Sequence, residues 1–142
     1  ALVALAGPFS NLILAIIVFF LLTLIAPQMM HVGDASELLF THGAGARIQA
    51  FIAQILASSL FINLGLMAFN LIPIAPLDGS KIIHPFIPLA FEEQYQWLMD
   101  KGPFILITLL VLERAFDFPF ILWWISFIVE GVLGVLMSVV AG

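Results

Sequence analysis

One long, uncharged apolar run in this sequence ends in two prolines and an acid. After a run that begins near Ile48, the chain reads Asn70-Leu71-Ile72-Pro73-Ile74-Ala75-Pro76-Leu77-Asp78-Gly79. Pro73 and Pro76 lack a backbone N–H and push the residues before them out of the helical region, so a helix must end here. Non-helical backbone inside a membrane survives only where it is buried in protein or lines a wet cavity. The pattern therefore predicts a broken helix that presents the Asp78 carboxylate in a pocket, and an ionisable group at that depth is a candidate functional residue.

The composition indicates that this break belongs to a membrane protein. Hydrophobic residues make up 63% of the chain and charged residues 9%, whereas a soluble domain carries about 25% charged residues. The absence of cysteine excludes disulfides and thiolate metal sites. The four basic residues form no patch, which excludes nucleic acid as a partner. The length allows one compact bundle, so we expect residues 1–142 to form a single transmembrane domain.

Four apolar segments predict an all-α membrane protein, a multi-pass bundle of transmembrane helices. They run from about Leu2 to Ala26, Ile48 to Leu71, Pro103 to Leu112 and Phe118 to Val140. The third segment is too short to cross a bilayer alone, because a crossing helix needs roughly 20 residues. It could cross only if the stretch Trp97–Met99 or Glu113–Asp117 is included. Pro8 fits the first turn of the first helix or a kink near its end. Trp123 and Trp124 are placed as interfacial anchors.

Three polar or mixed stretches connect these segments. Residues Pro27–Arg47 predict a solvent-side loop, with a short interfacial helix around Ser36–Phe40. Residues Ser80–Phe91 form a short amphipathic piece that two prolines interrupt. Residues Glu92–Gly102 read as a polar link to the third apolar segment.

Each candidate site residue also has a structural interpretation. Asp78 could be the N-cap of a short helix that begins at Gly79, as well as a functional carboxylate or metal ligand. The amide of Asn70 could bond the helix carbonyls freed by Pro73, or it could donate to a peptide oxygen and stabilise developing negative charge. Asn11 lies in a stripe of small or polar residues with Gly7 and Ala15, which close helix packing explains without any chemistry.

The remaining ionisable residues carry weaker signals. We expect His31 and His42 to be solvated in the polar loop and His84 to have a structural or surface role. Glu113 reads as an interfacial ion pair with its neighbour Arg114. Glu130 lies inside the last apolar segment and could face the bundle.

The motif Asn70-x-x-Pro73-x-x-Pro76-Leu77-Asp78-Gly79 resembles the signature of the site-2 proteases, peptidase family M50, which are zinc metalloproteases that cut inside membranes. The segment Ala6-Gly7-Pro8-x-x-Asn11 resembles a second motif, which precedes it in the compact prokaryotic members. The resemblance covers essentially the whole chain and fits the short prokaryotic type. It implies that the chain is the C-terminal portion of the family's transmembrane core.

The resemblance implies that Asp78 is the third ligand of a catalytic Zn²⁺. It implies that the other two ligands and the general base belong to an H-E-x-x-H helix, in which two histidines share one face. By the same analogy, Asn70 and Asn11 are catalytic residues near the active site. This sequence contains no H-E-x-x-H. Because it begins at Ala1 without Met, we expect a truncated chain that is inactive alone.

The implied activity is cleavage of a transmembrane helix in a single-pass, membrane-anchored protein, within a prokaryotic cell membrane. Two alternatives stay open at this point. Discontinuous helices with an intramembrane acid also build the sites of transporters and channels. A non-catalytic subunit that binds transmembrane segments would carry the same hydrophobic pattern.

Overall fold

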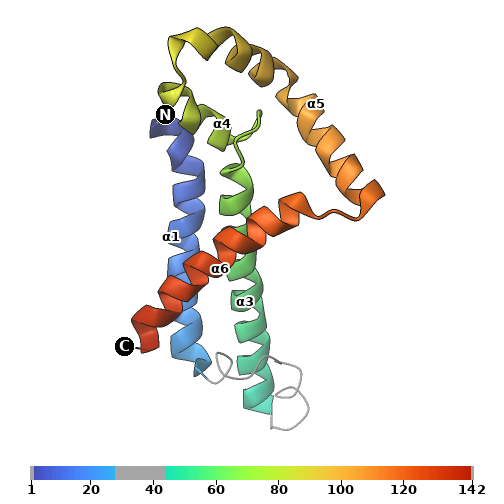
Figure 1. Ribbon diagram of the computed structural model, residues 1–142. Helices are drawn as coiled ribbons and strands as arrows, with labels where there is room; N and C mark the ends of the chain where they lie inside the picture. The colour runs from blue at the N-terminus through green and yellow to red at the C-terminus, as the bar shows by residue number, and fades with distance from the viewer. Residues whose placement is uncertain (1, 28–43, 142) are drawn as a thin grey trace. The chain divides into compact units, whose positions relative to one another are not determined.

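The computed structural model describes residues 2–27 and 44–141, and every regular element in these two ranges is helical (Figure 1). The elements are α1 (Leu2–Ile25), α3 (Ala44–Asn70), α4 (Asp78–Ile83), η2 (His84–Phe86), η3 (Leu89–Phe91), α5 (Glu92–Phe116) and α6 (Phe120–Ala141). This confirms the all-α prediction. The helix expected around Ser36–Phe40 lies outside the described residues, as do His31 and His42.

Among the described residues, three helices are long and apolar enough to cross a membrane. The candidate spans are Val3–Ile25 in α1, Arg47–Asn70 in α3 and Phe120–Val140 in α6. Many of their apolar side chains lie exposed on the surface of the structure. Contact of these side chains with water would be unfavourable, whereas contact with lipid would not. The prediction of an all-α membrane protein is thus confirmed, with the third apolar segment carried by α5.

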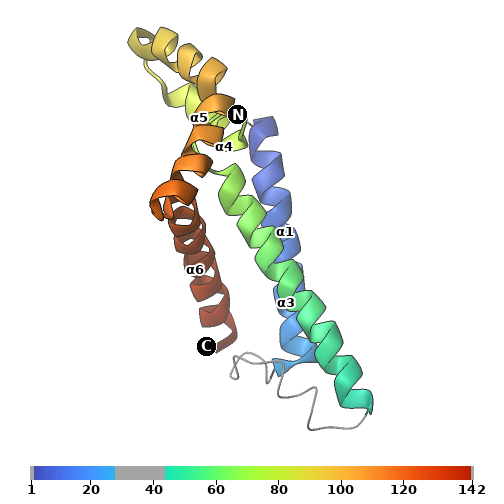
Figure 2. The same ribbon diagram turned by 90° about the vertical axis from the view of Figure 1, so that its right-hand side faces the viewer.

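Residues 12–64 form one compact unit, which contains the C-terminal part of α1 and most of α3. The two helical segments lie side by side in both views (Figures 1 and 2). Small buried residues, Ala15, Ala50 and Ala53, suit the close approach of two helix backbones. The Gln49 side-chain amide donates a hydrogen bond to the Ile25 carbonyl, which closes this unit near the end of α1.

Residues 1–11 and 65–142 form the second compact unit, which holds the interrupted helix. Its core joins the segment after α3 to α5 and α6, with Ile72, Leu77, Leu106 and Ile121 buried together. The indole N–H of Trp124, which packs against this cluster, donates a hydrogen bond of 3.0 Å to the Ala68 carbonyl near the end of α3. The non-helical segment is therefore held by side chains from two later helices.

The polar link predicted at Glu92–Gly102 is wrong, because these residues form the first part of α5. The helix continues through Pro103, which removes the N–H that would bond the Met99 carbonyl. Glu92 and Glu93 lie in its first turn, where negative charge stabilises a helix. The helix ends at Asp117, whose φ of 55° is left-handed and stops further helical bonding.

The carboxylate of Glu113 bonds the first turn of α6 rather than Arg114. Its Oε1 accepts hydrogen bonds from the backbone N–H groups of Ile121, at 3.1 Å, and Leu122, at 3.4 Å. These are helix-start donors that have no partner inside the helix. The expected Glu113–Arg114 pair is therefore absent from the ion pairs of the described residues. Glu130 is exposed on α6 and does not face the packed side of its unit.

Candidate metal centre

The site is built on the interruption between α3 and α4. Helix α3 ends at Asn70, and residues 71–77 form turns in which Ile72 N–H bonds the Phe69 carbonyl at 3.1 Å and Leu77 N–H bonds the Ile74 carbonyl at 3.0 Å. The Phe69 carbonyl is the one that Pro73 would leave without a partner in a helix. The backbone of the break thus satisfies that group itself. The Ala75–Pro76 peptide bond within these turns is cis.

Helix α4 begins with Asp78, but Asp78 is not its N-cap. The cap is Leu77, an extended residue with φ −70° and ψ 155° that makes no side-chain capping bond. The Ser80 hydroxyl donates a hydrogen bond of 2.6 Å back to the Leu77 carbonyl. The capping interpretation of Asp78 is therefore wrong.

Two glycines let the backbone of the break pack closely. A Cβ added to Gly79 would collide with the carbonyl oxygens of Leu71 and Ile72. A Cβ added to Gly102 of α5 would lie 2.6 Å from the Ala75 carbonyl oxygen. Both approaches are closer than side-chain carbon atoms allow, so each position requires glycine.

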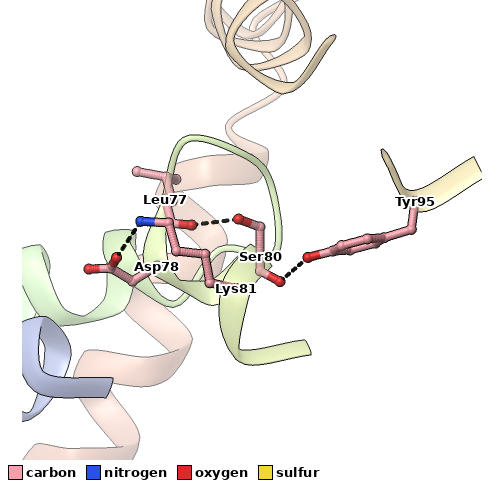
Figure 3. Close-up of polar contacts among 5 residues, drawn as sticks. All are labelled: Leu77, Asp78, Ser80, Lys81 and Tyr95. Carbon is pink, nitrogen blue, oxygen red and sulfur yellow. Dashed lines mark hydrogen bonds and ion pairs between the residues drawn. The ribbon is translucent and has the colours of Figure 1, made fainter. Parts of the chain in front are cut away.

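The Asp78 carboxylate lies between α4 and the N-terminal part of α1. Its Oδ1 pairs with Lys81 Nζ at 3.1 Å, and its side chain is 28% exposed (Figure 3). On the other side, a Cβ added to Gly7 would lie 2.7 Å from Oδ2, so this oxygen rests against the bare backbone of α1. Oδ2 makes no hydrogen bond with the residues that the structure describes.

Tyr95 of α5 anchors the other end of the first turn of α4. Its buried hydroxyl donates a hydrogen bond to the Ser80 carbonyl (Figure 3). Burial, with a smaller effect of the Glu92 carboxylate, raises the pKa of Tyr95, so the phenol remains a donor at neutral pH. His84 packs against the Tyr95 ring with 5.1 Å between centroids and contacts Glu92 Oε1 at 3.1 Å. Hydrogen bonds from Gln96 and then His84 lower the pKa of Glu92.

The two candidate asparagines lie at the edges of the site. Asn70 is the last residue of α3, and Asn11 lies one helical turn beyond Gly7 on the same face of α1. Both side chains are half-buried. Within the described ranges, neither amide hydrogen-bonds to the Asp78 carboxylate, and Asn70 bonds none of the carbonyls of the break. The structural interpretation of Asn70 therefore finds no support.

The donor set fits one ligand of a zinc site. A half-buried carboxylate with one oxygen unbonded is a suitable hard ligand for Zn²⁺. Catalytic zinc takes three protein ligands, and the described residues contain no group of three His, Cys, Asp or Glu that could hold a metal. His84, the histidine nearest in sequence to Asp78, contacts Glu92 instead.

Several residues that shape the site were not identified from the sequence. Lys81 follows Asp78 by three positions, and opposite charges at this spacing on a helix are a readable signal for a pair. Tyr95 and Gly102 act on the break from α5, more than fifteen residues away, and no local pattern marks them. Gly7 belongs to the stripe of small or polar residues in the first apolar segment, but only the tertiary structure shows its contact with Asp78.

Comparison with known proteins assigns the family. The model of peptidase family M50 matches residues 1–110. The chain is 34% identical over 122 residues to the "Putative zinc metalloprotease YwhC" of Bacillus subtilis (strain 168), a match that covers 86% of this chain and 49% of the relative. The chain thus spans about half the length of this curated relative. No solved structure matches the chain. The residues that carry the two sequence motifs lie within the matched range, and the chain belongs to peptidase family M50, the site-2 protease family.

Proposed function

We propose that the protein is an intramembrane zinc metalloprotease of the site-2 type, in which Asp78 is a zinc ligand. The main support for this proposal is the Asp78 carboxylate at the helix break. This carboxylate is half-buried, and its Oδ2 makes no hydrogen bond with the described residues. Membership of peptidase family M50 and three apolar helices of membrane-spanning length support it.

The remaining ligands and the general base are assigned to an H-E-x-x-H helix elsewhere in the protein, since these 142 residues contain no such motif. Zinc, when bound, supplies a polarised carbonyl and a water whose pKa is lowered to about 7. This chain contributes the Asp78 oxygen that holds the metal. It also contributes two amides, Asn70 and Asn11, that can donate to a peptide oxygen of the substrate.

The proposed substrate is the transmembrane helix of a single-pass, membrane-anchored protein, and the proposed location is a prokaryotic cell membrane. A helix must unwind before its peptide bond can be attacked, and the unwound strand needs partners for its backbone. The non-helical residues 71–77 lie next to Asp78 and follow the end of α3, a helix of membrane-spanning length. Pro73 and Pro76 are exposed there, so the break is open to a second chain and to water.

The test measures zinc and cleavage together in the full-length protein purified in detergent. Asp78→Ala, and the similarly shaped Asp78→Asn, should lower bound zinc from about one equivalent to a small fraction and abolish cleavage of a model transmembrane substrate, since zinc needs three protein ligands. Asp100→Asn, which changes an exposed acid of α5, is the matched control and should keep both. Wild-type cleavage by Asp78→Ala would refute the ligand assignment.

The same experiment separates the proposal from its rivals. A transporter or channel has no reason to release peptide fragments, and family membership gives that alternative no support. A non-catalytic subunit that binds transmembrane segments would capture the substrate without cutting it, with or without Asp78. Capture without cleavage by the zinc-loaded wild-type protein would therefore favour the binding subunit.

A further inference from the structure

The two oxygens of the Asp78 carboxylate have different surroundings. Oδ1 is 3.1 Å from Lys81 Nζ, three residues along the same helix. Oδ2 faces Gly7 of α1, where a side-chain carbon would lie 2.7 Å away. The two contacts come from segments that are more than seventy residues apart in sequence.

The backbone that carries this carboxylate is fixed independently of Lys81. Ser80 bonds the Leu77 carbonyl through its hydroxyl, and the Ser80 carbonyl accepts the Tyr95 hydroxyl. Gly79 lies tightly against the carbonyls of residues 71 and 72. With the backbone held in this way, the remaining freedom of Asp78 is rotation of its own side chain. Among the described residues, Lys81 pairs with one carboxylate oxygen and Gly7 lies against the other.

We propose that Lys81 and Gly7 are positioning residues for the Asp78 carboxylate. Lys81 retains Oδ1, and the absence of a side chain at Gly7 leaves space for Oδ2, the oxygen that we assign to the metal. This inference rests on the proposed function, in which Asp78 is a zinc ligand. It makes the carboxylate a one-oxygen ligand. Asp78 would then supply one oxygen to a zinc ion, and two further protein ligands and a water would complete the four ligands usual for catalytic zinc.

The role of Lys81 is tested by the absorption spectrum of Co²⁺ bound to the full-length protein in place of zinc. Visible bands of Co²⁺ are intense in four-coordinate sites and weaker in five-coordinate ones. Lys81→Met removes the partner of Oδ1, so both oxygens can reach the metal and the bands should lose intensity. Lys81→Gln keeps a hydrogen-bond donor and should restore most of the wild-type spectrum. Lys101→Met, an exposed lysine of α5, is the control and should leave the spectrum unchanged.

The role of Gly7 is tested by zinc affinity, measured by titration of Zn²⁺ into the metal-free full-length protein. Gly7→Ala places a methyl group against Oδ2 and should weaken zinc binding by about 10–100-fold, the usual effect of changing a residue that orients a metal ligand. Gly131→Ala in α6, where an added Cβ meets nothing within 4 Å, should bind zinc as the wild type does.

The outcomes separate this inference from the proposed function. If Asp78→Asn loses zinc while Lys81→Met keeps the wild-type Co²⁺ spectrum and Gly7→Ala keeps the wild-type affinity, Asp78 is a ligand and the positioning roles are wrong. If Asp78→Asn itself retains zinc, the proposed function fails. A thermal unfolding midpoint for each variant identifies any that does not fold. Lys81 is exposed on α4, so Lys81→Ala is a second variant that removes the partner of Oδ1, and an unchanged Co²⁺ spectrum in it would equally overturn the role of Lys81.

Discussion

The Asp78 carboxylate contacts two segments that are distant in sequence, α4 through Lys81 and α1 at Gly7. Each contact restricts the carboxylate without hydrogen-bonding Oδ2. A capping acid would instead accept hydrogen bonds from the backbone N–H groups at the start of the helix. The arrangement suits a metal ligand, which is the role that we propose for Asp78.

The side chain of Asn70 is also available for a functional role. It is half-buried, and its amide bonds none of the carbonyls of the break. We expect Asn70→Ala in the full-length protein to lower turnover by about 10²–10³-fold, the loss seen when one donor to a developing oxyanion is removed. Zinc content should stay at the wild-type level. The measurement is the cleavage rate at saturating substrate, with metal analysis of the same sample.

Asn63→Ala offers a control for a polar residue of the same helix, since its amide bonds the Ser59 carbonyl one turn away. It should change turnover little. Loss of zinc in Asn70→Ala would show that this residue supports the metal site structurally rather than the substrate.

Among the helices, α5 does most to hold the break in place. Gly102 approaches Ala75, Tyr95 bonds Ser80, and Leu106 joins the buried cluster with Ile72. Three residues along α5 thus contact the segment from residue 72 to residue 80. The position of the carboxylate depends on a helix that carries no proposed catalytic residue.

Gly102→Ala tests this dependence. The added methyl group would overlap Ala75, and overpacking of this kind costs about 1–3 kcal/mol, which should lower the unfolding midpoint in detergent. Gly134→Ala in α6 meets open space and should be neutral or stabilising by up to about 1 kcal/mol, because alanine favours helix more than glycine does. Equal midpoints for the two variants would contradict the packing described for Gly102.

The sequence was sufficient to predict the three spanning helices and the break, because apolar runs and prolines act locally. It was insufficient for α5, since the polar residues before Pro103 resemble a loop by composition although they are good helix formers. The sequence also did not reveal the hydrogen bonds of Glu113, because their donors are backbone N–H groups eight and nine residues further along the chain, in the next helix. The acid of the site could be found from its motif, whereas the contacts that orient it depend on tertiary packing.

The described residues contain three helices of membrane-spanning length, and α5 is not one of them. The apolar side chains exposed on α1, α3 and α6 should therefore face lipid. These 142 residues contain no cysteine, so a single cysteine introduced in this region can report its own surroundings.

We expect Leu14→Cys, Phe61→Cys and Val135→Cys to resist a membrane-impermeant maleimide in membrane fragments that are open on both faces. Each side chain is exposed in the structure and lies within a candidate span, where lipid or another helix would cover it. Glu93→Cys and Lys101→Cys, at exposed polar positions of α5, should be labelled. Detergent should make all five reactive. Labelling of the first three without detergent would contradict the assignment of these helices to the membrane.

The most direct test of the account is a structure of the full-length protein with zinc bound. We predict that Asp78 Oδ2 lies about 2.0–2.2 Å from the metal, which two histidines of an H-E-x-x-H helix also bind, with Lys81 still paired with Oδ1. A zinc ion held without Asp78, or an Asp78 carboxylate that points to bulk solvent away from any histidine pair, would contradict it.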